Sequence, residues 1–294
     1  MGIVLGLLGA LSWGSSDLLA RFATQKIGTF RAMLYMQLTG LLLLTVALHW
    51  MGGWSHLVSG LGWRGWEWGI CAGFLNTCAS LALYRAIEIG KMSVVAPISS
   101  SYPALTLLLA ALGGERLTLQ RLAGLGLILA GVVIVAQGEE PAGGTNPTGE
   151  KQQSSKRHLG VGWALVSAVG FGLLFWVLGT RAVPLEGSAQ SVWIIRVTCV
   201  VLTLAAMLIF RQPITLARTG AKWYVLGMGV LDTGAYVLNN YGMQHEQVSV
   251  VSVLSSLYGA VTVGWAATIL GEKISRTQWM AIAAIFAGIV LVSW

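Results

Sequence analysis

Long apolar runs separated by short polar segments extend over the whole chain. Each run is about 20 residues long, and a helix of that length, at 1.5 Å per residue, crosses roughly 30 Å of hydrocarbon. The pattern therefore predicts transmembrane helices. We expect ten of them, at residues 2–20, 32–50, 67–86, 93–112, 119–137, 159–180, 190–210, 222–243, 249–270 and 277–293.

The composition agrees with a bilayer setting. Only 10% of the 294 residues are charged and 55% are apolar, whereas soluble globular proteins are about a quarter charged. Mean hydropathy is +0.74, which excludes an ordinary soluble fold. We expect the first run to remain in the mature chain, because no basic residue precedes it and it contains Trp13 and Asp17, unlike a cleavable signal peptide.

The two halves of the chain resemble each other. Residues 73–102 align without gaps with residues 229–258, with ten identities in thirty positions. After a one-residue shift, residues 113–135 align with residues 270–292, and LSWG against VGFG extends the match into the first helix of each half. This internal similarity predicts a duplicated structural unit.

Residues 138–158 separate the matching segments. They combine Pro, Gly, Gln and mixed charge without apolar periodicity, which is typical of a solvated linker. We predict a first repeat at 1–137 and a second at 159–294. Each holds five helices, an odd number, so the second enters the membrane in the opposite direction. The expected fold is an all-α integral membrane protein of ten transmembrane helices as two inverted five-helix repeats, from which alternating access follows.

The basic residues report orientation. The net charge of +7 is dispersed among short loops and does not indicate nucleic-acid binding. Of the 18 Lys and Arg residues, 13 lie in the odd-numbered loops between predicted helices and 4 in the even-numbered loops. The positive-inside rule then places the odd loops in the cytoplasm and both termini outside.

Three charged side chains fall within the predicted spans: Asp17, Arg196 and Asp232. A charge at membrane depth costs several kcal/mol, so each is expected to face the bundle interior or water. Asp17 is a candidate gate or proton-coupling group, or a partner of Arg21 one turn later. Arg196 has no partner one turn away and has to bind a carboxylate on another helix, a carbonyl or an anionic substrate.

Two polar stripes run along predicted helices at corresponding repeat positions, where Asp232 aligns with Asn76. Such stripes are candidates for holding a polar solute near the midplane, with Asp232 exchanging a proton or neutralising a substrate ammonium. The alternative is an interhelical hydrogen-bonded staple that includes Arg196. The stripes are Asn76, Ser80 and Tyr84 in one helix, and Asp232, Tyr236 and Asn240, with Asn239 beside them, in the other.

Aromatic residues within spans are further candidates for the solute site. Their rings accept apolar groups, or an ammonium through cation–π contact, and the alternative is packing in the core or against lipid. They are Trp13, Tyr102, Trp176, Trp193, Tyr236 and Tyr258.

A serine run that includes Ser100 interrupts the fourth predicted helix between Pro97 and Pro103. Proline removes a backbone donor, so this helix is expected to kink and to offer polar groups to the solute, or else to pack closely through its small residues. Glu115 and Glu272 lie in the turns before the fifth helix of each half. A capping-box pattern, SRTQ, follows Glu272, so we interpret both Glu residues as structural.

No residue pattern indicates an enzyme, a metal site or a cofactor. The four histidines lie at span ends or in loops, and no HExxH, GxSxG or Walker sequence occurs. Cys71, Cys78 and Cys199 lie within predicted spans and are interpreted as small packing residues.

The chain resembles the EamA-type ten-helix members of the drug/metabolite transporter superfamily. The resemblance rests on LSWGSSD near the start, the paired S-V-V…S-S-x-Y segments, the paired G-E-R/K turns and the L/F-A-G helices that close each half. It implies an inner-membrane carrier of amino acids, related metabolites, sugars or drugs, usually an exporter. It also implies a cavity between the first four helices of each half, a peripheral fifth helix, and cytoplasmic termini, which the charge count here opposes.

These features together predict a secondary active transporter of a small polar or amphipathic metabolite, amino-acid-like or an amine, in the cytoplasmic (inner) membrane. We expect an exporter that works by alternating access, with Asp232 or Asp17 as the proton-coupling group or gate. A channel or a facilitative uptake permease is the alternative. The expected partners are the solute and membrane lipids, without nucleic acid, and the chain is expected to act as a monomer or homodimer.

Overall fold

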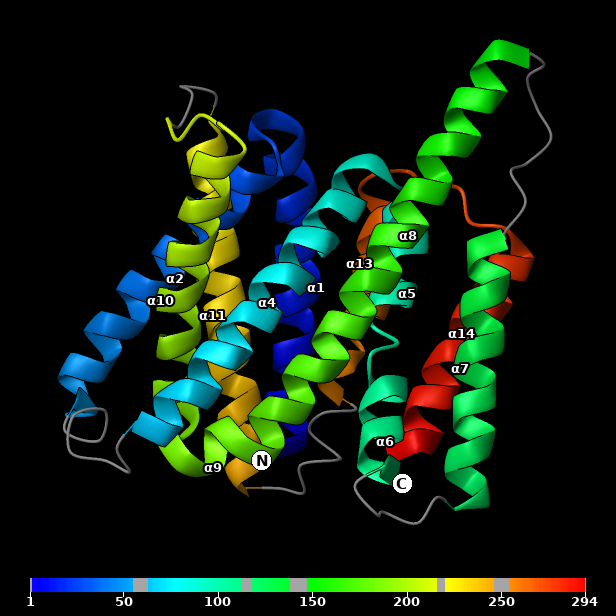
Figure 1. The fold of residues 1–294 in the computed structure, drawn as a ribbon. Helices are drawn as coiled ribbons and strands as arrows, with labels where there is room; N and C mark the ends of the chain where they lie inside the picture. The colour runs from blue at the N-terminus through cyan, green and yellow to red at the C-terminus, as the bar shows by residue number, and fades with distance from the viewer. Residues whose placement is uncertain are drawn as a thin grey trace.

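The computed structural model describes residues 2–54, 63–112, 118–137, 147–215, 220–245 and 254–293, and these residues form helices and no strands. The helices are α1 (Gly2–Ile27), α2 (Thr29–Trp50), α4 (Trp63–Ile89), α5 (Met92–Ser99), α6 (Pro103–Leu112), α7 (Leu119–Gln137), α8 (Pro147–Val177), the π-helical turn η1 (Leu178–Ala182), α9 (Val183–Glu186), α10 (Ser188–Ile209), α11 (Ala221–His245), α13 (Tyr258–Thr268) and α14 (Arg276–Ser293). Both chain termini lie at the same end of the bundle (Figure 1).

The apolar runs predicted from the sequence all contain helix in the part of the chain that the structure describes. Six stretches there are long and apolar enough to cross a membrane, and the chain is a multi-pass membrane protein. They are Thr29–Trp50, Gly65–Ile89, Met92–Leu109, Leu119–Ala136, Leu159–Glu186 and Ser188–Ile209. The expectation of ten spans stays a prediction.

The sixth predicted span is longer in the structure than at 159–180. Helix α8 begins at Pro147, inside the segment expected to be a linker, because proline fits the first turn of a helix and the polar residues after it tolerate helical geometry. At the other end, the π-helical turn η1 continues the helix through α9 to Glu186. Residues 138–146 of the expected linker lie outside the described residues.

The fourth helix of each half is interrupted. The predicted kink is confirmed in the first half, where α5 ends at Ser99 and α6 begins at Pro103. In the second half a turn at Leu257 separates a short helical segment from α13, which begins at Tyr258. The two breaks bring Tyr102 and Tyr258, which align in the repeat, to matching places beside the bundle centre.

The main packing contacts between the two halves have counterparts when the helices of the first half are matched in chain order with those of the second. Helix α1 packs on α11, and its counterpart α8 packs on α4; α2 packs on α11, and its counterpart α10 packs on α4. Helix α1 also contacts α13, as α8 contacts α5 and α6. Helices at equivalent places in the two halves also contact each other: α2 contacts α10, and α7 contacts α14. The interrupted fourth helices meet through α5 and α13.

Two glycines start the second helix of each half in the same unusual backbone conformation. Gly28, before α2, has φ 80° and ψ 162°, and Gly187, before α10, has φ 87° and ψ 169°. Side chains are almost never tolerated in this region of backbone space. The correspondence aligns the two helices residue by residue and places Gln37 opposite Arg196.

Helices α7 and α14 lie side by side at one edge of the molecule (Figure 1). A Cβ atom added to Gly124 would lie 2.8 Å from the carbonyl oxygen of Gly288, so the two backbones approach without side chains between them. This close approach indicates that Gly124 and Gly288 allow the two helices to pack tightly. Large apolar side chains such as Leu129 and Val133 are exposed on α7 and suit a lipid-facing surface.

Candidate functional site

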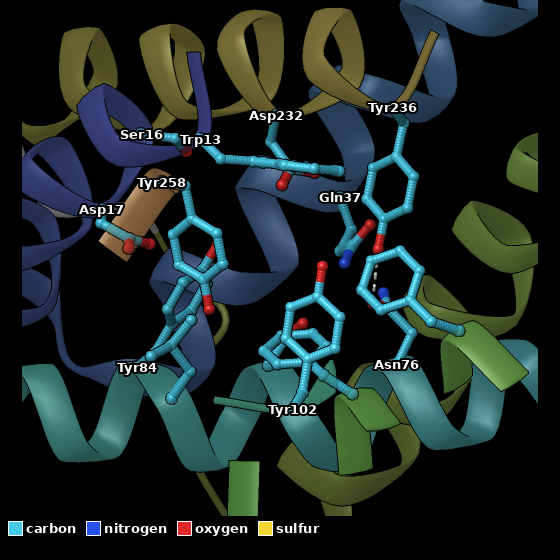
Figure 2. A pocket seen from close by; sticks show the side chains of 14 residues that line it. Trp13, Ser16, Asp17, Gln37, Asn76, Tyr84, Tyr102, Asp232, Tyr236 and Tyr258 are labelled. Carbon is cyan, nitrogen blue, oxygen red and sulfur yellow. Dashed lines mark hydrogen bonds between the residues drawn. The ribbon is translucent and has the colours of Figure 1, made fainter. Parts of the chain in front are cut away.

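A cavity lies at the bundle centre, between helices of both halves. It is bordered by the middle of α1, α2, α4, α8 and α11 and by the helix starts at Tyr102 and Tyr258. Its walls mix acids, amides, hydroxyls and aromatic rings, and Figure 2 shows these side chains converging on one space. The lining residues are Trp13, Ser16, Asp17, Gln37, Asn76, Ser80, Leu83, Tyr84, Tyr102, Phe171, Phe175, Asp232, Tyr236 and Tyr258.

Most residues selected from the sequence border this cavity. Residues of both polar stripes line it, and so do three of the five mid-span aromatics that lie outside the stripes. The selected residues that line it are Trp13, Asp17, Asn76, Ser80, Tyr84, Tyr102, Asp232, Tyr236 and Tyr258.

Other selected residues lie away from the cavity wall. The Ser100 hydroxyl donates to the carbonyl oxygen of Pro97 at 3.2 Å. Its neighbours Ser99 and Ser101 likewise donate to backbone carbonyls within α5. Proline has no N–H, so the break in the helix leaves backbone carbonyl oxygens short of donors. The serine hydroxyls donate to carbonyl oxygens at the break and are not among the groups that line the cavity.

Two tryptophans and an asparagine also pack outside the cavity. Trp193 donates its indole N–H to the Thr45 hydroxyl at 3.0 Å and is stacked edge-on with other tryptophans at one end of the bundle. Trp176 packs against the apolar core. Asn239 is buried and accepts a hydrogen bond from the Ser255 hydroxyl at 2.5 Å. The side chain of Asn240 lies outside the described part of the chain.

Asp232, which lines the cavity, forms an ion pair with Arg196, which lies behind the cavity wall. The Arg196 side chain is fully buried; its Nη2 atom pairs with Asp232, and its Nη1 atom donates to the amide oxygen of Gln37 at 2.6 Å. The guanidinium also lies over the Tyr236 ring, 5.3 Å from its centroid. Of the partners expected for Arg196, the structure therefore selects a carboxylate on another helix.

The two polar stripes meet through a hydrogen bond across the cavity. The Tyr236 hydroxyl on α11 donates to the amide oxygen of Asn76 on α4 at 3.1 Å. The amide nitrogen of Asn76 points at the Cys199 sulfur, 3.3 Å away. Asn76 is thus held by groups from α11 and α10, and its carbonyl is fixed beside the cavity.

Asp17 is buried and does not pair with Arg21. Its carboxylate accepts a hydrogen bond from the Thr262 hydroxyl of α13 at 3.0 Å, and the side chain is 6% exposed. Arg21 points to another helix, where it donates to the carbonyl oxygens that end α4, including that of Gly90 at 2.9 Å. The expected intrahelical pair is wrong: the Thr262 hydroxyl binds Asp17, and the carbonyls that end α4 bind Arg21.

Aromatic rings enclose the cavity. Trp13 crosses it and meets Tyr236, Tyr258 and Phe175 edge-on, with ring centroids 5.2, 6.3 and 6.3 Å away. On the opposite side Tyr102 stacks on Phe175 with centroids 4.7 Å apart. Edge-on contacts leave the ring faces directed into the space between them.

The sequence interpretation missed five lining residues. The LSWG and VGFG match already aligned Trp13 with Phe171, and the same offset carried four residues further aligns Asp17 with Phe175. Gln37 carries no local signal, and only the matched glycines before α2 and α10 relate it to Arg196. The missed residues are Ser16, Gln37, Leu83, Phe171 and Phe175.

At the end of the bundle opposite the termini, the second half caps a helix of the first. Both carboxylate oxygens of Glu272 accept hydrogen bonds from the backbone N–H groups of Met92 and Ser93, at 3.0 and 2.9 Å, at the start of α5. The capping box is also confirmed, with reciprocal bonds between Ser275 and Gln278. Glu272 is structural, as expected, while Glu115 lies outside the described residues.

The side chains described here contain no cluster of three or more His, Cys, Asp and Glu residues that could hold a metal ion. The cavity presents two carboxylates, hydroxyl and amide groups, and aromatic rings. Neither carboxylate faces a histidine or other base among the lining residues.

Comparison with known proteins identifies the family. The chain is 30% identical over 135 residues to the uncharacterized protein MJ1333.1 of Methanocaldococcus jannaschii, an alignment that covers 46% of this chain and 95% of that protein. A crystal structure of a protein superposes with a TM-score of 0.63 at 20% identity, covering 99% of this chain and 95% of that chain, so the fold is shared. A sequence model of EamA-like transporters matches residues 1–137 and 158–294. The chain belongs to the EamA-like transporter family.

Proposed function

We propose that this chain is a secondary active transporter of a small polar or amphipathic metabolite, amino-acid-like or an amine, that works by alternating access. The observation that carries the proposal is the central cavity, which helices of both halves build and which combines ionisable groups with aromatic walls. Membership of a transporter family supports the same function. Export is the proposed direction.

The proposed architecture is ten transmembrane helices in two inverted repeats. The exchange-related packing of α1 with α11 and of α4 with α8 supports a pseudo-two-fold relation. The equivalent backbone conformations of Gly28 and Gly187 support it at single-residue level. A relative that matches half of this chain over nearly all of its own length is consistent with one repeat as a unit. Rocking of one half against the other would expose the cavity to each side in turn.

The proposed location is the cytoplasmic membrane, with both termini outside. The end of the bundle opposite the termini carries Arg21, Lys26 and Arg85, in line with the excess of basic residues expected on the cytoplasmic side. Reporter fusions at the C-terminus test this orientation: alkaline phosphatase, which is active outside, should give signal, and a cytoplasmic fluorescent protein should not. The reverse pattern would overturn the orientation and leave the transport proposal in place.

Counterflow in proteoliposomes tests the transport proposal. Vesicles loaded with a high concentration of an unlabelled amine or amino acid should accumulate the labelled solute transiently, and uptake should saturate. A channel gives neither trans-stimulation nor saturation, and a facilitative uptake permease gives counterflow without uphill export. Vesicles without protein are the control.

Proton coupling is proposed to use Asp17, with Asp232 as the alternative. Asp232 is engaged by Arg196, whereas Asp17 accepts one hydroxyl hydrogen bond and has no cationic partner among the described residues. An imposed pH gradient should drive uphill solute movement in the parent protein. Asp17→Asn should abolish the driven movement while counterflow measures what exchange remains. Unchanged driven movement would exclude Asp17 as the coupling site.

A further inference from the structure

The charges of the cavity do not balance within the described residues. Two carboxylates, Asp17 and Asp232, line it. The guanidinium of Arg196 neutralises Asp232, and Arg21, the nearest cation to Asp17 along α1, is bound to the carbonyls that end α4. One negative charge, that of Asp17, therefore remains without a cationic partner in this part of the chain.

The surroundings of Asp17 provide little compensation for an ionised carboxylate. The side chain is 6% exposed and receives one hydrogen bond, from the Thr262 hydroxyl. Burying a carboxylate without a counter-charge is unfavourable by several kcal/mol in proteins. A cation that enters the cavity would remove this penalty, so the cavity is predisposed to bind positive charge.

The walls beside Asp17 suit an organic cation. Tyr84 and Tyr258 lie next to the carboxylate, and Trp13 lies between Tyr258 and Tyr236 (Figure 2). The electron-rich faces of such rings attract an ammonium group, and more strongly when water is excluded. The Tyr258 side chain is 7% exposed and borders the cavity beside Trp13.

The described wall of the same cavity offers no cation for a ligand carboxylate. Arg196 does not line it, and its guanidinium already binds Asp232 and Gln37. The helix start beside Tyr102 is not an anion site either: Pro103 has no N–H, and the next two backbone N–H groups donate to carbonyls within the turn. A zwitterionic amino acid would bring an ammonium that Asp17 attracts and a carboxylate that meets only neutral donors in the described wall.

We propose that the cavity selects organic monocations with an apolar or aromatic body over zwitterionic amino acids, and that Asp17 is the counter-ion. This inference narrows the substrate class and rests on the proposed transport function for its biological meaning. The binding step itself can be measured without transport. The ammonium contact that the sequence suggested for Asp232 is thereby assigned to Asp17, which has no cationic partner among the described residues.

Equilibrium dialysis of the full chain in lipid nanodiscs tests the selectivity with three matched probes. Phenethylamine carries an ammonium, which like that of lysine stays protonated at neutral pH. Phenylalanine adds a carboxylate to the same body, and 2-phenylethanol replaces the ammonium by a neutral hydroxyl. Phenethylamine should bind about tenfold or more tightly than either, since tenfold corresponds to only about 1.4 kcal/mol.

Variants then assign the charge contact. Asp17→Asn, nearly equal in volume, should weaken phenethylamine binding by about tenfold or more and leave 2-phenylethanol unchanged. Asp17→Glu keeps the charge and should retain the preference for the amine. Glu67→Gln, which removes an exposed acid of α4, is the matched control and should bind as the parent does. Melting curves establish that each variant is folded, and if Asp17→Asn is not, the probe series on the parent and Asp17→Glu decides.

The outcomes separate this inference from the transport proposal. Phenylalanine binding as tightly as phenethylamine, or an Asp17→Asn protein that binds the amine normally, would overturn the inference, while counterflow of phenylalanine would still support a carrier. Amine binding that depends on Asp17 without amine counterflow would uphold the site and refute the carrier function.

Discussion

Asp232 on α11 and Arg196 on α10 form an ion pair in which the arginine is fully buried and the carboxylate is 15% exposed. The amide of Gln37 on α2 binds the same guanidinium. Three helices from the two halves are therefore joined at one buried cation. Gln37 and Arg196 each lie nine residues after the matching glycines that precede α2 and α10, so the charge asymmetry of this centre reflects a sequence difference between the two halves of the chain.

We predict that removing the carboxylate destabilises the protein strongly. Asp232→Ala leaves the guanidinium buried without a counter-charge, and breaking such a pair costs about 3–5 kcal/mol. Urea or SDS titration of the purified protein in detergent, followed by circular dichroism, measures the loss. The melting temperature should fall accordingly.

A double-mutant cycle separates the ion pair from local packing. Asp232→Leu together with Arg196→Met removes both charges and should destabilise the protein less than Asp232→Leu alone or Arg196→Met alone, because no buried charge remains unpaired. Effects of the single changes that simply add would contradict the coupling.

We predict that Glu272 holds the start of α5. Glu272→Ala frees the backbone N–H groups of Met92 and Ser93, and loss of a helix cap costs about 0.5–2 kcal/mol. Hydrogen exchange at the first turn of α5 should accelerate in the variant. Lys273→Ala, which changes the exposed neighbour in the same turn, is the control and should exchange like the parent. Equal exchange in all three proteins would refute the capping role.

Helix positions were largely predictable because the thickness of the bilayer sets the length of each apolar run. The break at Pro97 and Pro103 was also predictable, since proline cannot donate to the helix. The π-helical turn η1 was not, because nothing in the apolar pattern distinguishes it from an ordinary helical turn. The helical start of α8 within a polar segment was missed for a related reason: polar residues are compatible with both helix and loop.

The cavity residues were predictable where helical spacing and repeat alignment agreed. Asn76 and Tyr236 came from aligned stripes, and these side chains meet in the structure. Ser100 was misplaced because spacing cannot tell whether a hydroxyl turns to a cavity or back to its own helix. The partner of Asp17 was predicted wrongly because side chains from other helices compete with an arginine one turn away. Here the Thr262 hydroxyl of α13 binds the carboxylate.

We predict that two glycines of α7, separated by one residue, differ sharply in their tolerance of alanine. A Cβ on Gly124 would lie 2.8 Å from the backbone oxygen of Gly288 and 2.9 Å from Leu291, whereas a Cβ on Gly126 would meet nothing within 4 Å. Gly124→Ala should therefore lower the free energy of unfolding by about 1–3 kcal/mol. Gly126→Ala should leave it unchanged or raise it by up to about 1 kcal/mol, because alanine favours helix.

Thermal melting in detergent compares the two α7 variants directly. Binding of a cavity ligand should be retained in both, because neither α7 nor α14 lines the cavity. Equal melting temperatures for Gly124→Ala and Gly126→Ala would show that α7 and α14 do not pack as described.

We predict that Gly28→Ala and Gly187→Ala destabilise the protein to a similar extent. Both glycines have φ near 80–87° with extended ψ, a region in which a side chain costs about 1–3 kcal/mol. No atom lies within 4 Å of a Cβ on Gly28, and Gly187 would meet only the flexible end of Gln190. The penalty is therefore one of backbone conformation at both sites. Gly179→Ala, at a helical position with open space around it, is the control and should melt like the parent. A large loss at one glycine and none at the other would contradict the equivalence of the two helix starts, and with it the residue-by-residue alignment that places Gln37 opposite Arg196.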